Sequence, residues 1–512
     1  MHATIERAKP DAEHVDVLVI GAGLSGICAG YHLQTSCPWL TYAILESREA
    51  IGGTWDLFRY PGVRSDSDMP TLGYTFRPWT DEKAIADGPS ILKYVRDTAA
   101  EFGIDEHIRF RHRVVSADWD TDEALWTLRV ETAEGERTLT CRWLFGATGY
   151  YDYEAGHAPR FEGQEEFAGT IVHPQHWPDD LDYSAKRVVV IGSGATAVTL
   201  VPEMAKTAAH VTMLQRSPTW IVSMPSKDRI ANWLHGKVGA KAAHGLTRWK
   251  NIAYTIYSYQ LSQRLPNLVG GQLNKMAAAE LPEGFDVETH LKPSYRPWDQ
   301  RLCLVPDGDL FAAIKEGRAD IVTDRIERFE ADGIRLASGE KLEADVIVSA
   351  TGLAIKVLGG IEMRVDGEPV DMSRTYSYKG ALYSGIPNCS VALGYTNASW
   401  TLKCELVARY TCRILNHMAV EGHDYAVPRA PAPEMGTRTT FELSSGYLER
   451  ARHLIPKQTD RGPWRQYQNY LLDMRLLRFG SVTDEMIFGR RGEREALKRS
   501  EANAELPEAE AA

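Results

Sequence analysis

The stretch VDVLVIGAGLSGICAGYHL, residues 15–33, decides the fold. An apolar run of strand length leads into Gly21, Gly23 and Gly26, and helix-forming residues follow. In this spacing the first glycine makes a tight turn, the second lets the backbone approach a pyrophosphate, and the third lets the helix pack on the strand. Glu46 ends the apolar stretch YAILE, 20 residues after Gly26. A carboxylate there can accept hydrogen bonds from ribose hydroxyls, so the pattern predicts an ADP-binding Rossmann unit rather than a chance glycine turn.

A second unit of the same kind begins at Lys186, with the sequence KRVVVIGSGATAVTLVPEMA. Its next strand, HVTMLQRSP, carries Gln215 and Arg216 where the first unit has its acid. A guanidinium can pair with a 2′-phosphate, which predicts NADPH here and FAD at the first unit; the alternative is that Arg216 is a solvated surface charge. The predicted NADPH contacts are Gly192, Ser193, Gly194, Ala195, Thr196, Ala197, Arg216 and Ser217.

Two later strands, LTCRWLFGATGYYD and LEADVIVSATGL, both end in A-T-G, at Gly149 and Gly352. Small residues suit a place where the chain crosses between domains beside a cofactor. We therefore predict an α/β protein with two Rossmann-like dinucleotide-binding domains, for FAD and NADPH, and a helical insertion in the second. The predicted divisions are 1–155 (FAD domain, first segment), 156–180 (linker), 181–349 (NADPH domain), 350–490 (FAD domain, second segment) and 491–512 (a disordered tail).

The helical insertion is predicted at about 222–295, where apolar residues recur at helical spacing beside a basic face. Two interpretations stay open. The segment could form a cap over the active site, or it could lie on a membrane surface as an amphipathic helix.

Composition limits the partners. The chain has 512 residues, a formal net charge of -11 and no long basic run, which argues against nucleic acid. Neither a signal peptide nor a membrane span is evident, so we expect a cytoplasmic protein, with peripheral membrane contact through the insertion left open. Seven scattered cysteines without a C-x-x-C argue against a disulfide scaffold, a structural zinc or a redox dithiol. No metal is predicted, and the oligomeric state is not determined.

A further motif lies between the two units. Phe167, Gly169, His173 and Trp177 form F-x-G-x-x-x-H-x-x-x-W-P, which resembles the fingerprint of the type I Baeyer-Villiger monooxygenases within the flavin-containing monooxygenase superfamily. GGTWDLFRYPGVRSDSDMPTLGYTFRPW, RPWDQRLCLVPDGDLF and GYTNASW are similar to the ethionamide-activating branch. In that family the fingerprint links the nucleotide domains. A metal on the histidines is disfavoured, because Pro174 and Pro178 oppose a helix.

The resemblance implies an FAD- and NADPH-dependent enzyme that converts ketones to esters or lactones through a C4a-peroxyflavin, and that also oxidises the sulfur of thioethers or thioamides. Arg301 matches the family's active-site arginine and Asp66 the carboxylate that orients it, although each could instead belong to a structural salt bridge. The flavin contacts implied by motif are Thr54, Trp55, Asp56, Arg64, Ser65, Asp66 and Val114.

One departure concerns NADPH. Many family members have a lysine before the catalytic arginine, where this chain has Gln300. NADPH preference would then rest on Arg216 with help from Ser217 or Thr219. Two other functions stay open: a heteroatom-oxidising flavin monooxygenase with little ketone activity, and a non-catalytic redox sensor that binds FAD and NADPH.

Overall fold

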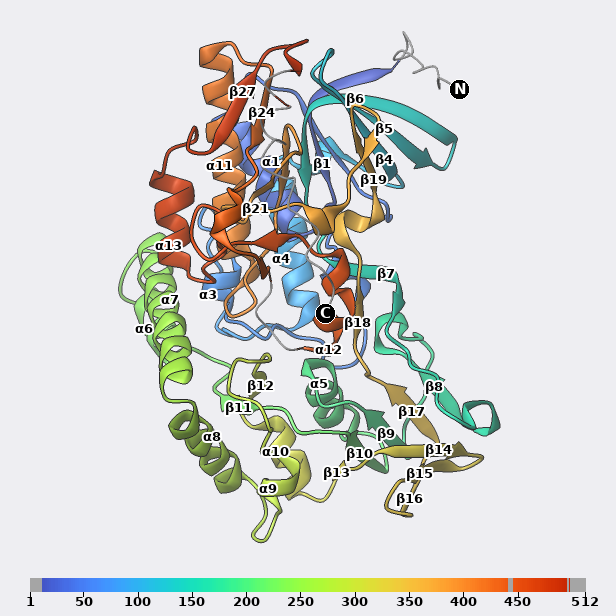
Figure 1. Cartoon of the computed structure of the whole chain (residues 1–512). Coiled ribbons are helices and arrows are strands. Elements are labelled where there is room, and N and C mark those ends of the chain that lie inside the picture. Colours follow the sequence, from blue (N-terminus) through green and yellow to red (C-terminus); the bar gives the residue numbers. More distant parts are fainter. Residues whose placement is uncertain (1–11, 441–444, 495–496, 498–512) are drawn as a thin grey trace.

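Two sheet-centred halves make up the molecule in the computed structural model, which describes residues 12–440, 445–494 and 497. The first half lies at the top of Figure 1 and the second at the bottom. The first half contains both ends of the described chain, and the second is formed from the middle of the sequence.

The first sheet has eleven strands around a parallel centre in the order β6-β1-β2-β3. β1 ends in four buried apolar residues, which is typical of a parallel strand covered on both faces. Val17 and Val19 pack under a helical layer, whereas Leu18 and Ile20 pack on the opposite face. The bounds are β1 Glu13–Ile20, β2 Tyr42–Leu45, β3 Ile108–Arg109 and β6 Gly135–Gly146, and the covering helices are α1 Leu24–Ser36, α4 Gly88–Glu101 and α11 Trp400–Glu421.

Shorter strands complete this half. β23 pairs in parallel with the end of β6, so the chain rejoins the first sheet after it has formed the second half. The strands are β4 Arg113–Asp120, β5 Leu125–Thr132, β19 Glu362–Val365, β20 Glu368–Pro369, β21 Ser377–Tyr378, β22 Leu382–Tyr383 and β23 Cys389–Val391, with a separate pair, β24 Tyr425–Pro428 and β27 Met486–Gly489.

The predicted disordered tail needs a correction at its start. Arg494 donates to both oxygens of Asp122, at 2.9 and 2.6 Å, and Leu497 is buried in the first half. These residues therefore pack on the sheet, because they bring an apolar side chain and a paired charge to it. Residues 495–496 and 498–512 lie outside the described residues.

The second sheet is wholly parallel, in the order β13-β10-β9-β17-β8. Helices cover one face and a three-stranded antiparallel sheet covers the other. With the first sheet, this confirms the prediction of an α/β fold with two Rossmann-like units. The bounds are β8 Thr170–Val172, β9 Arg187–Ile191, β10 His210–Gln215, β13 Ala319–Thr323 and β17 Val346–Ser349, with α5 Ala195–Met204, α10 Asp309–Lys315, β14 Ile326–Glu330, β15 Gly333–Leu336 and β16 Lys341–Glu343.

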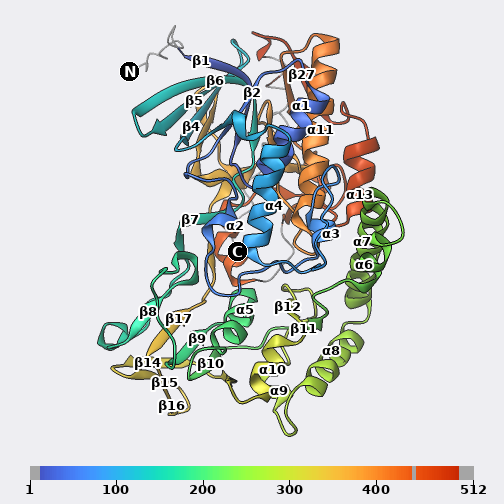
Figure 2. The same ribbon diagram turned by 180° about the vertical axis from the view of Figure 1, so that it is seen from behind.

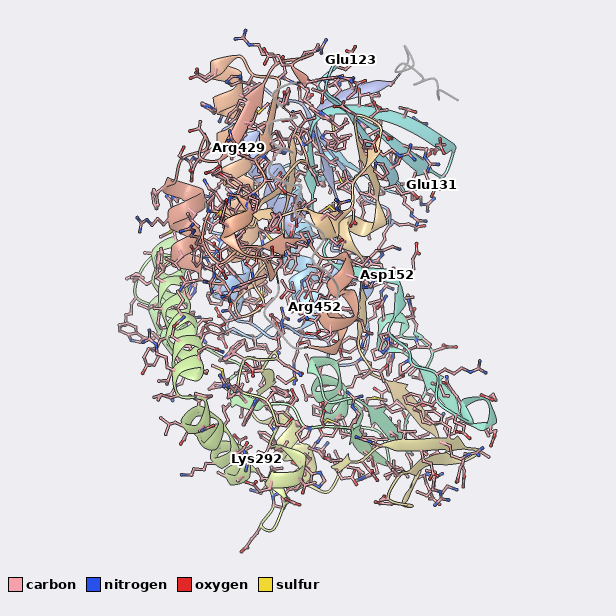
Figure 3. The ribbon with its side chains drawn as sticks, in the orientation of Figure 1. Glu123, Glu131, Asp152, Lys292, Arg429 and Arg452 are labelled. Carbon is pink, nitrogen blue, oxygen red and sulfur yellow. The ribbon has the colours of Figure 1, made fainter. Side chains whose placement is uncertain are left out.

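The chain crosses between the halves twice, and the two crossings pair with each other. β7 (Tyr151–Gly156) follows the first A-T-G and β18 (Leu353–Ile355) follows the second, and they form an antiparallel ribbon. Asp152, labelled at the junction in Figure 3, forms an ion pair with Lys356 at 3.3 Å. The ribbon and this ion pair join the two crossing segments to each other.

The helical insertion lies between two short parallel strands, β11 (Ile221–Met224) and β12 (Cys303–Pro306). Its helices run along one flank of the molecule, which both views show (Figures 1 and 2). Within the described residues, none of the helices has the length and apolar character needed to cross a membrane. The helices are α6 Arg229–His235, α7 Ala240–Arg264, α8 Pro266–Glu280 and α9 Val287–His290.

Buried polar contacts attach α7 to the first half. Arg248 donates to the carbonyls of Pro70, Thr71 and Gly73 at 3.0, 3.1 and 2.7 Å, at the C-terminal end of the short helix α3 (Met69–Leu72). A cation there satisfies carbonyls that have no partner within the helix. The insertion is thus fixed next to the segment that carries Asp66.

Candidate functional site

The first glycine turn is tightly enclosed. A side chain on Gly26 would bring its Cβ to 1.9 Å from the carbonyl oxygen of Gly21, and one on Gly21 would meet the carbonyl oxygen of Ala147 at 2.6 Å. Both carboxylate oxygens of the buried Glu46 accept backbone hydrogen bonds, from Ala22 at 2.8 Å and from Arg48 at 2.9 Å. The turn and its carboxylate are therefore held in place before any ligand binds.

The double glycine that follows lies against this turn. Gly52 donates to the carbonyl of Ala22 at 3.1 Å, and α2 (Thr54–Leu57) begins directly after Gly53. The hydroxyl of Thr54 is 3.2 Å from that of Tyr153 on β7. The motif thereby brings Thr54 and Trp55 to the cavity described below.

Asp56 does not line that cavity, although the motif implied a flavin contact. Its carboxylate is buried, and it forms ion pairs with Arg48 at 2.8 Å and Arg96 at 2.9 Å. A buried carboxylate needs such partners. In this structure Asp56 anchors α2 to α4.

The second glycine turn repeats the backbone path but is more open. A Cβ on Gly192 would meet the carbonyl oxygen of Ala350 at 2.4 Å, the counterpart of Gly21 and Ala147. A Cβ on Gly194 would meet nothing within 4 Å. The hydroxyl of Ser193 donates to the carbonyl of Ser217 at 3.1 Å. Each A-T-G therefore supplies the carbonyl against which a glycine turn closes, which explains why the two motifs recur together.

Arg216 and Ser217 lie at the exposed end of β10, outside the cavity. No hydrogen bond or ion pair engages the Arg216 guanidinium in the described part of the chain. The suggestion that Thr219 helps to bind a 2′-phosphate was wrong, because Thr219 is buried and its hydroxyl lies 2.9 Å from that of Tyr295.

A cavity of about 630 Å³ lies where the two halves meet, within the range of ligand sites. It receives residues from the first glycine turn, from the N-terminal turn of α5 and from the segment before β12. The predicted site residues that line it are Gly21, Gly23, Glu46, Thr54, Trp55, Arg64, Ser65, Asp66, Val114, Ala195, Thr196 and Arg301. Those that do not are Gly26, Asp56, Gly192, Ser193, Gly194, Ala197, Arg216, Ser217 and the four fingerprint residues.

Arg301 and Asp66 meet inside this cavity although 235 residues separate them. Nη1 of Arg301 donates to Oδ2 of Asp66 at 2.9 Å, and about a third of each side chain stays exposed, at 33% and 40%. Burial lowers the pKa of Arg301, but Asp66 together with the neighbouring Tyr150, Tyr151 and Tyr447 raises it well above its ordinary value. The pair therefore presents an oriented, permanently charged guanidinium to the cavity.

Arg64 connects the same loop to the second half. It forms an ion pair with Asp309, the first residue of α10, and its Nη2 is 3.3 Å from Oδ1 of Asp309. Since Asp66 is two residues away, this ion pair fixes the loop against the half that supplies Arg301. The hydroxyl of Ser65 donates to the carbonyl of Ser67 at 2.6 Å and closes the loop on itself.

A group of tyrosines surrounds the guanidinium. Tyr150 and Tyr151 join hydroxyl to hydroxyl at 2.8 Å, and Tyr447, on α12 (Gly446–Ala451), interacts electrostatically with Arg301. Burial raises the pKa of all three, so the hydroxyls stay protonated. Sequence reasoning missed them. The signal for two of them was the sequence YYDY directly after the first A-T-G, whereas nothing in the neighbouring sequence marks Tyr447.

The fingerprint stretch runs from the second sheet to the crossing ribbon. Its start includes β8, the edge strand that pairs with β17. The backbone at Gly169 passes close to that of Asp345, because a Cβ on Gly169 would lie 2.4 Å from the Asp345 carbonyl oxygen. The His173 ring packs on Gly156 of β7, where a Cβ would come within 2.1 Å of it. Phe167 and Trp177 pack in two cores of the second half. Burial lowers the pKa of His173, so its ring is neutral at pH 7.

The two glycine turns fit dinucleotides. Gly23 leaves space beside Gly53, since a Cβ on Gly23 would come to 3.6 Å from the Gly53 Cα. The buried Glu46 carboxylate lies at the strand end, the position at which a ribose binds in a Rossmann unit. The N-terminus of α5 provides the second anion site. Among the described residues, no group of three or more His, Cys, Asp or Glu could hold a metal ion. All seven cysteines are free and buried.

Comparison with known families gives two matches. Residues 78–357 match the flavin-binding monooxygenase-like family, and residues 19–81 match the NAD(P)-binding Rossmann-like domain. The FAD-containing monooxygenase EthA of Mycobacterium tuberculosis is 54% identical over 474 residues, which is 92% of this chain and 97% of that protein. The probable FAD-binding monooxygenase AlmA of Acinetobacter baylyi is 46% identical, over 93% of this chain and 96% of that protein.

Solved structures share the fold. An oxidized steroid monooxygenase bound to NADP superposes with a TM-score of 0.74 at 22% identity, over 93% of this chain and all of that one. Cyclohexanone monooxygenase from Rhodococcus sp. Phi1, bound to NADP+, gives 0.73 at 20% identity over 94% of this chain and all of that one. The two-unit architecture is therefore shared by enzymes whose sequences have diverged widely.

Proposed function

The chain belongs to the flavin-binding monooxygenase-like family, and we propose that it is an FAD- and NADPH-dependent Baeyer-Villiger monooxygenase. The reaction takes a ketone, O2, NADPH and a proton to an ester or lactone, NADP+ and water. One observation carries the proposal: the Arg301–Asp66 pair at 2.9 Å lies in the single cavity that also receives the first glycine turn and the N-terminus of α5.

The first half would hold FAD and the second NADPH. Gly21, Gly23 and Glu46 face the ADP part of FAD, and Thr54, Trp55 and the Arg64–Asp66 loop line the rest of the cavity. Ala195 and Thr196 offer their α5 amide groups to the phosphates of NADPH, and Arg216 faces its 2′-phosphate. Hydride transfer from NADPH and the reduction of O2 are chemistry that FAD supplies when it is bound.

In this proposal Arg301 stabilises the negative charge that develops during the reaction. Negative charge develops on oxygen when the ketone carbonyl is attacked, and a guanidinium that is already oriented stabilises that charge without reorganisation. Asp66 keeps the guanidinium in one pose through the 2.9 Å contact. The loop around Asp66 is held by Arg64 and Asp309, so the pose depends on both halves.

Oxidation of sulfur is a second proposed activity. It requires a proton donor near the reacting oxygen, because the electrophilic oxygen transferred to sulfur must be protonated. The hydroxyls of Tyr150 and Tyr151 stay protonated beside Arg301, and because their raised pKa makes them weak acids they are candidates for hydrogen-bond donors to that oxygen rather than for the source of the proton. The heteroatom-oxidising alternative and the redox sensor differ from the proposal in their products: the first forms little ester and the second forms no oxygenated product.

The experiment compares wild type with Arg301→Ala, Arg301→Lys and Asp66→Asn. NADPH oxidation, peroxide release, ester from an aliphatic ketone and sulfoxide from a thioether are measured in parallel. Loss of an oriented charge from the transition state predicts that ester formation by Arg301→Ala falls by about 10³-fold or more. Asp66→Asn is expected to retain part of the activity, because the guanidinium stays but is less well oriented.

Arg137→Ala is the matched control, because Arg137 is an exposed arginine of β6 that does not line the cavity, and its one ion pair among the described residues is a 3.9 Å contact with Glu134. Ester formation by Arg301→Ala within a few-fold of wild type would refute the role of Arg301. Sulfoxide without ester from wild type would favour the heteroatom enzyme, and slow NADPH oxidation without any product would favour the sensor.

A further inference from the structure

We propose that the outward side of the helical insertion is a docking surface for an anionic lipid bilayer. We call it the outer helical face and define it by the exposed side chains of Trp233, Leu246, Trp249, Tyr254, Tyr257 and Leu268, which lie on α6, α7 and α8. These helices form one flank of the molecule in both views (Figures 1 and 2). The proposal is independent of the reaction assigned to the cavity.

Exposed apolar side chains are concentrated on this flank. Of the seventeen large hydrophobic residues that are exposed in the described chain, ten fall between residues 229 and 280, about a tenth of the sequence. Tyr257 is 65% exposed and Trp233 62%. Isolated exposed apolar residues need no explanation, but a contiguous set on one element marks an interaction site.

The arrangement along α7 is the reverse of an ordinary surface helix. Between residues 242 and 257, residues 243, 244, 247, 248 and 252 are buried and include Arg248 and His244, whereas residues 242, 246, 249, 253, 254 and 257 are exposed and include no charge. A surface helix normally places its charged residues outward and its apolar stripe inward. The outward stripe of Leu246, Trp249 and Tyr257 is therefore available to a partner outside the described chain.

Packing within the molecule accounts for only part of the stripe, because Trp249 meets the Tyr470 ring edge-on at 6.0 Å whereas Tyr257 has no ring contact among the described residues. The inward side of α7 is attached by Arg248, which donates to three carbonyls of the α3 segment, and by Asn251, which donates to Asp68 at 2.8 Å. These buried contacts fix the orientation of the helix. The outer helical face is consequently presented as a preformed surface.

The charge on this flank indicates which partner it fits. Residues 229–280 contain seven Lys or Arg and one acidic residue, Glu280, in a chain whose formal net charge is -11. Arg229, Lys237, Lys241, Arg264 and Lys275 are exposed. Aromatic side chains beside lysine and arginine are the pattern of an interfacial helix on an anionic membrane, since the rings enter the headgroup region and the cations meet lipid phosphates. Because the protein as a whole is acidic, it would bind an anionic membrane only through this basic flank.

Docking here would place lipid next to the active site. A narrow crevice behind α7, lined by Ile252, Tyr259 and Tyr470, shares Ala398 with the main cavity. Helix α7 thus lies between the outer helical face and this crevice. A lipophilic substrate dissolved in the bilayer would reach the enzyme on this side.

The test uses the full-length protein and sedimentation with vesicles of phosphatidylcholine, with and without phosphatidylglycerol. We expect binding to the anionic vesicles that added salt weakens. Trp233→Ser combined with Leu246→Ser should lower the partition coefficient by about tenfold or more, because two apolar side chains no longer enter the interface. Lys237→Glu combined with Lys241→Glu should lower it by about tenfold or more on the anionic vesicles alone.

Val420→Ser is the matched control, since Val420 is 81% exposed but lies at the end of α11, outside the outer helical face. Each variant must melt like wild type and keep its NADPH oxidation with a water-soluble ketone. Failure of wild type to bind anionic vesicles, or equal loss in Val420→Ser, would overturn the proposal. So would light scattering that shows a dimer in wild type and a monomer in the Trp233→Ser and Leu246→Ser variant, because a second copy would then be the occupant.

Discussion

The two glycine turns follow the same backbone path, yet one is complete before a nucleotide binds and the other is not. At the first, both oxygens of the buried Glu46 are already engaged by backbone amides, and Gly26 leaves no room for a side chain. At the second, Ala197 takes the third glycine's place and the exposed Arg216 points from the end of a strand with no partner among the described residues. A closed, satisfied site suits a cofactor that stays bound, and an open one suits a nucleotide that exchanges in each turnover.

The largest effect is expected when a side chain is introduced into the closed first turn, and it is a loss of folding stability. Gly26→Ala would place a Cβ at 1.9 Å from the Gly21 carbonyl oxygen, so the turn must open. We expect the free energy of unfolding to fall by about 3 kcal/mol or more, measured by denaturant titration with flavin fluorescence. Gly194→Ala is the matched control because no atom lies within 4 Å, and its change should stay within about 0.5 kcal/mol. A loss within about 0.5 kcal/mol in Gly26→Ala as well would show that the first turn has room for a Cβ.

The second largest effect is expected when the buried carboxylate of Glu46 is replaced. Glu46→Gln replaces a carboxylate that accepts two backbone hydrogen bonds by an amide with one acceptor oxygen. We expect the dissociation constant of FAD to rise by about tenfold or more, measured by ultrafiltration of released flavin. Glu49→Gln, an exposed acid that pairs with Arg111, should bind FAD like wild type. Unchanged FAD affinity in Glu46→Gln would show that the Glu46 carboxylate does not contribute to FAD binding.

A smaller effect is expected at the second site. Arg216→Gln removes the guanidinium proposed to face the 2′-phosphate, so the KM for NADPH should rise by about tenfold while the KM for NADH changes by less than about twofold. Steady-state kinetics with both nucleotides measure this. Lys206→Gln, an exposed cation of the same half that pairs with Glu203, serves as control. A parallel change for NADPH and NADH would contradict the proposed contact.

The smallest effect concerns the stretch between the two regions. Burial lowers the pKa of His173 and the neighbouring His176 acts in the same direction, against backbone hydrogen bonds with Gly352 and His157 that raise it. Below the ordinary histidine pKa of about 6.5 the unfolded chain therefore binds more protons than the folded one, and stability falls as the pH falls through that value. A melting series from pH 7 downward should show this fall, and His173→Asn should flatten it. An identical pH profile in the variant would assign the fall to other groups.

The sequence by itself determined the two Rossmann units and much of the site. Gly21, Gly26 and Glu46 act within one strand-turn-helix-strand unit, so their spacing is enough to predict them. The A-T-G repeats likewise marked the crossings, because each one closes its turn through the carbonyl of Ala147 or Ala350. The prediction that Arg301 and Asp66 form a pair depended on a family resemblance, since 235 residues separate them.

Only the tertiary structure decided the rest. Tyr447 reaches Arg301 from a helix almost 150 residues further along the chain, Asp56 turned out to anchor α4, and Thr219 is engaged by Tyr295. The start of the predicted tail packs on the first sheet through Arg494. Such contacts join side chains that are distant in sequence, and they form only after the cores of both halves are packed. The spacing of residues in a motif is enough to predict a local turn. The hydrogen-bond partner of a buried polar group cannot be predicted in this way, because it depends on which distant segment the fold places next to that group.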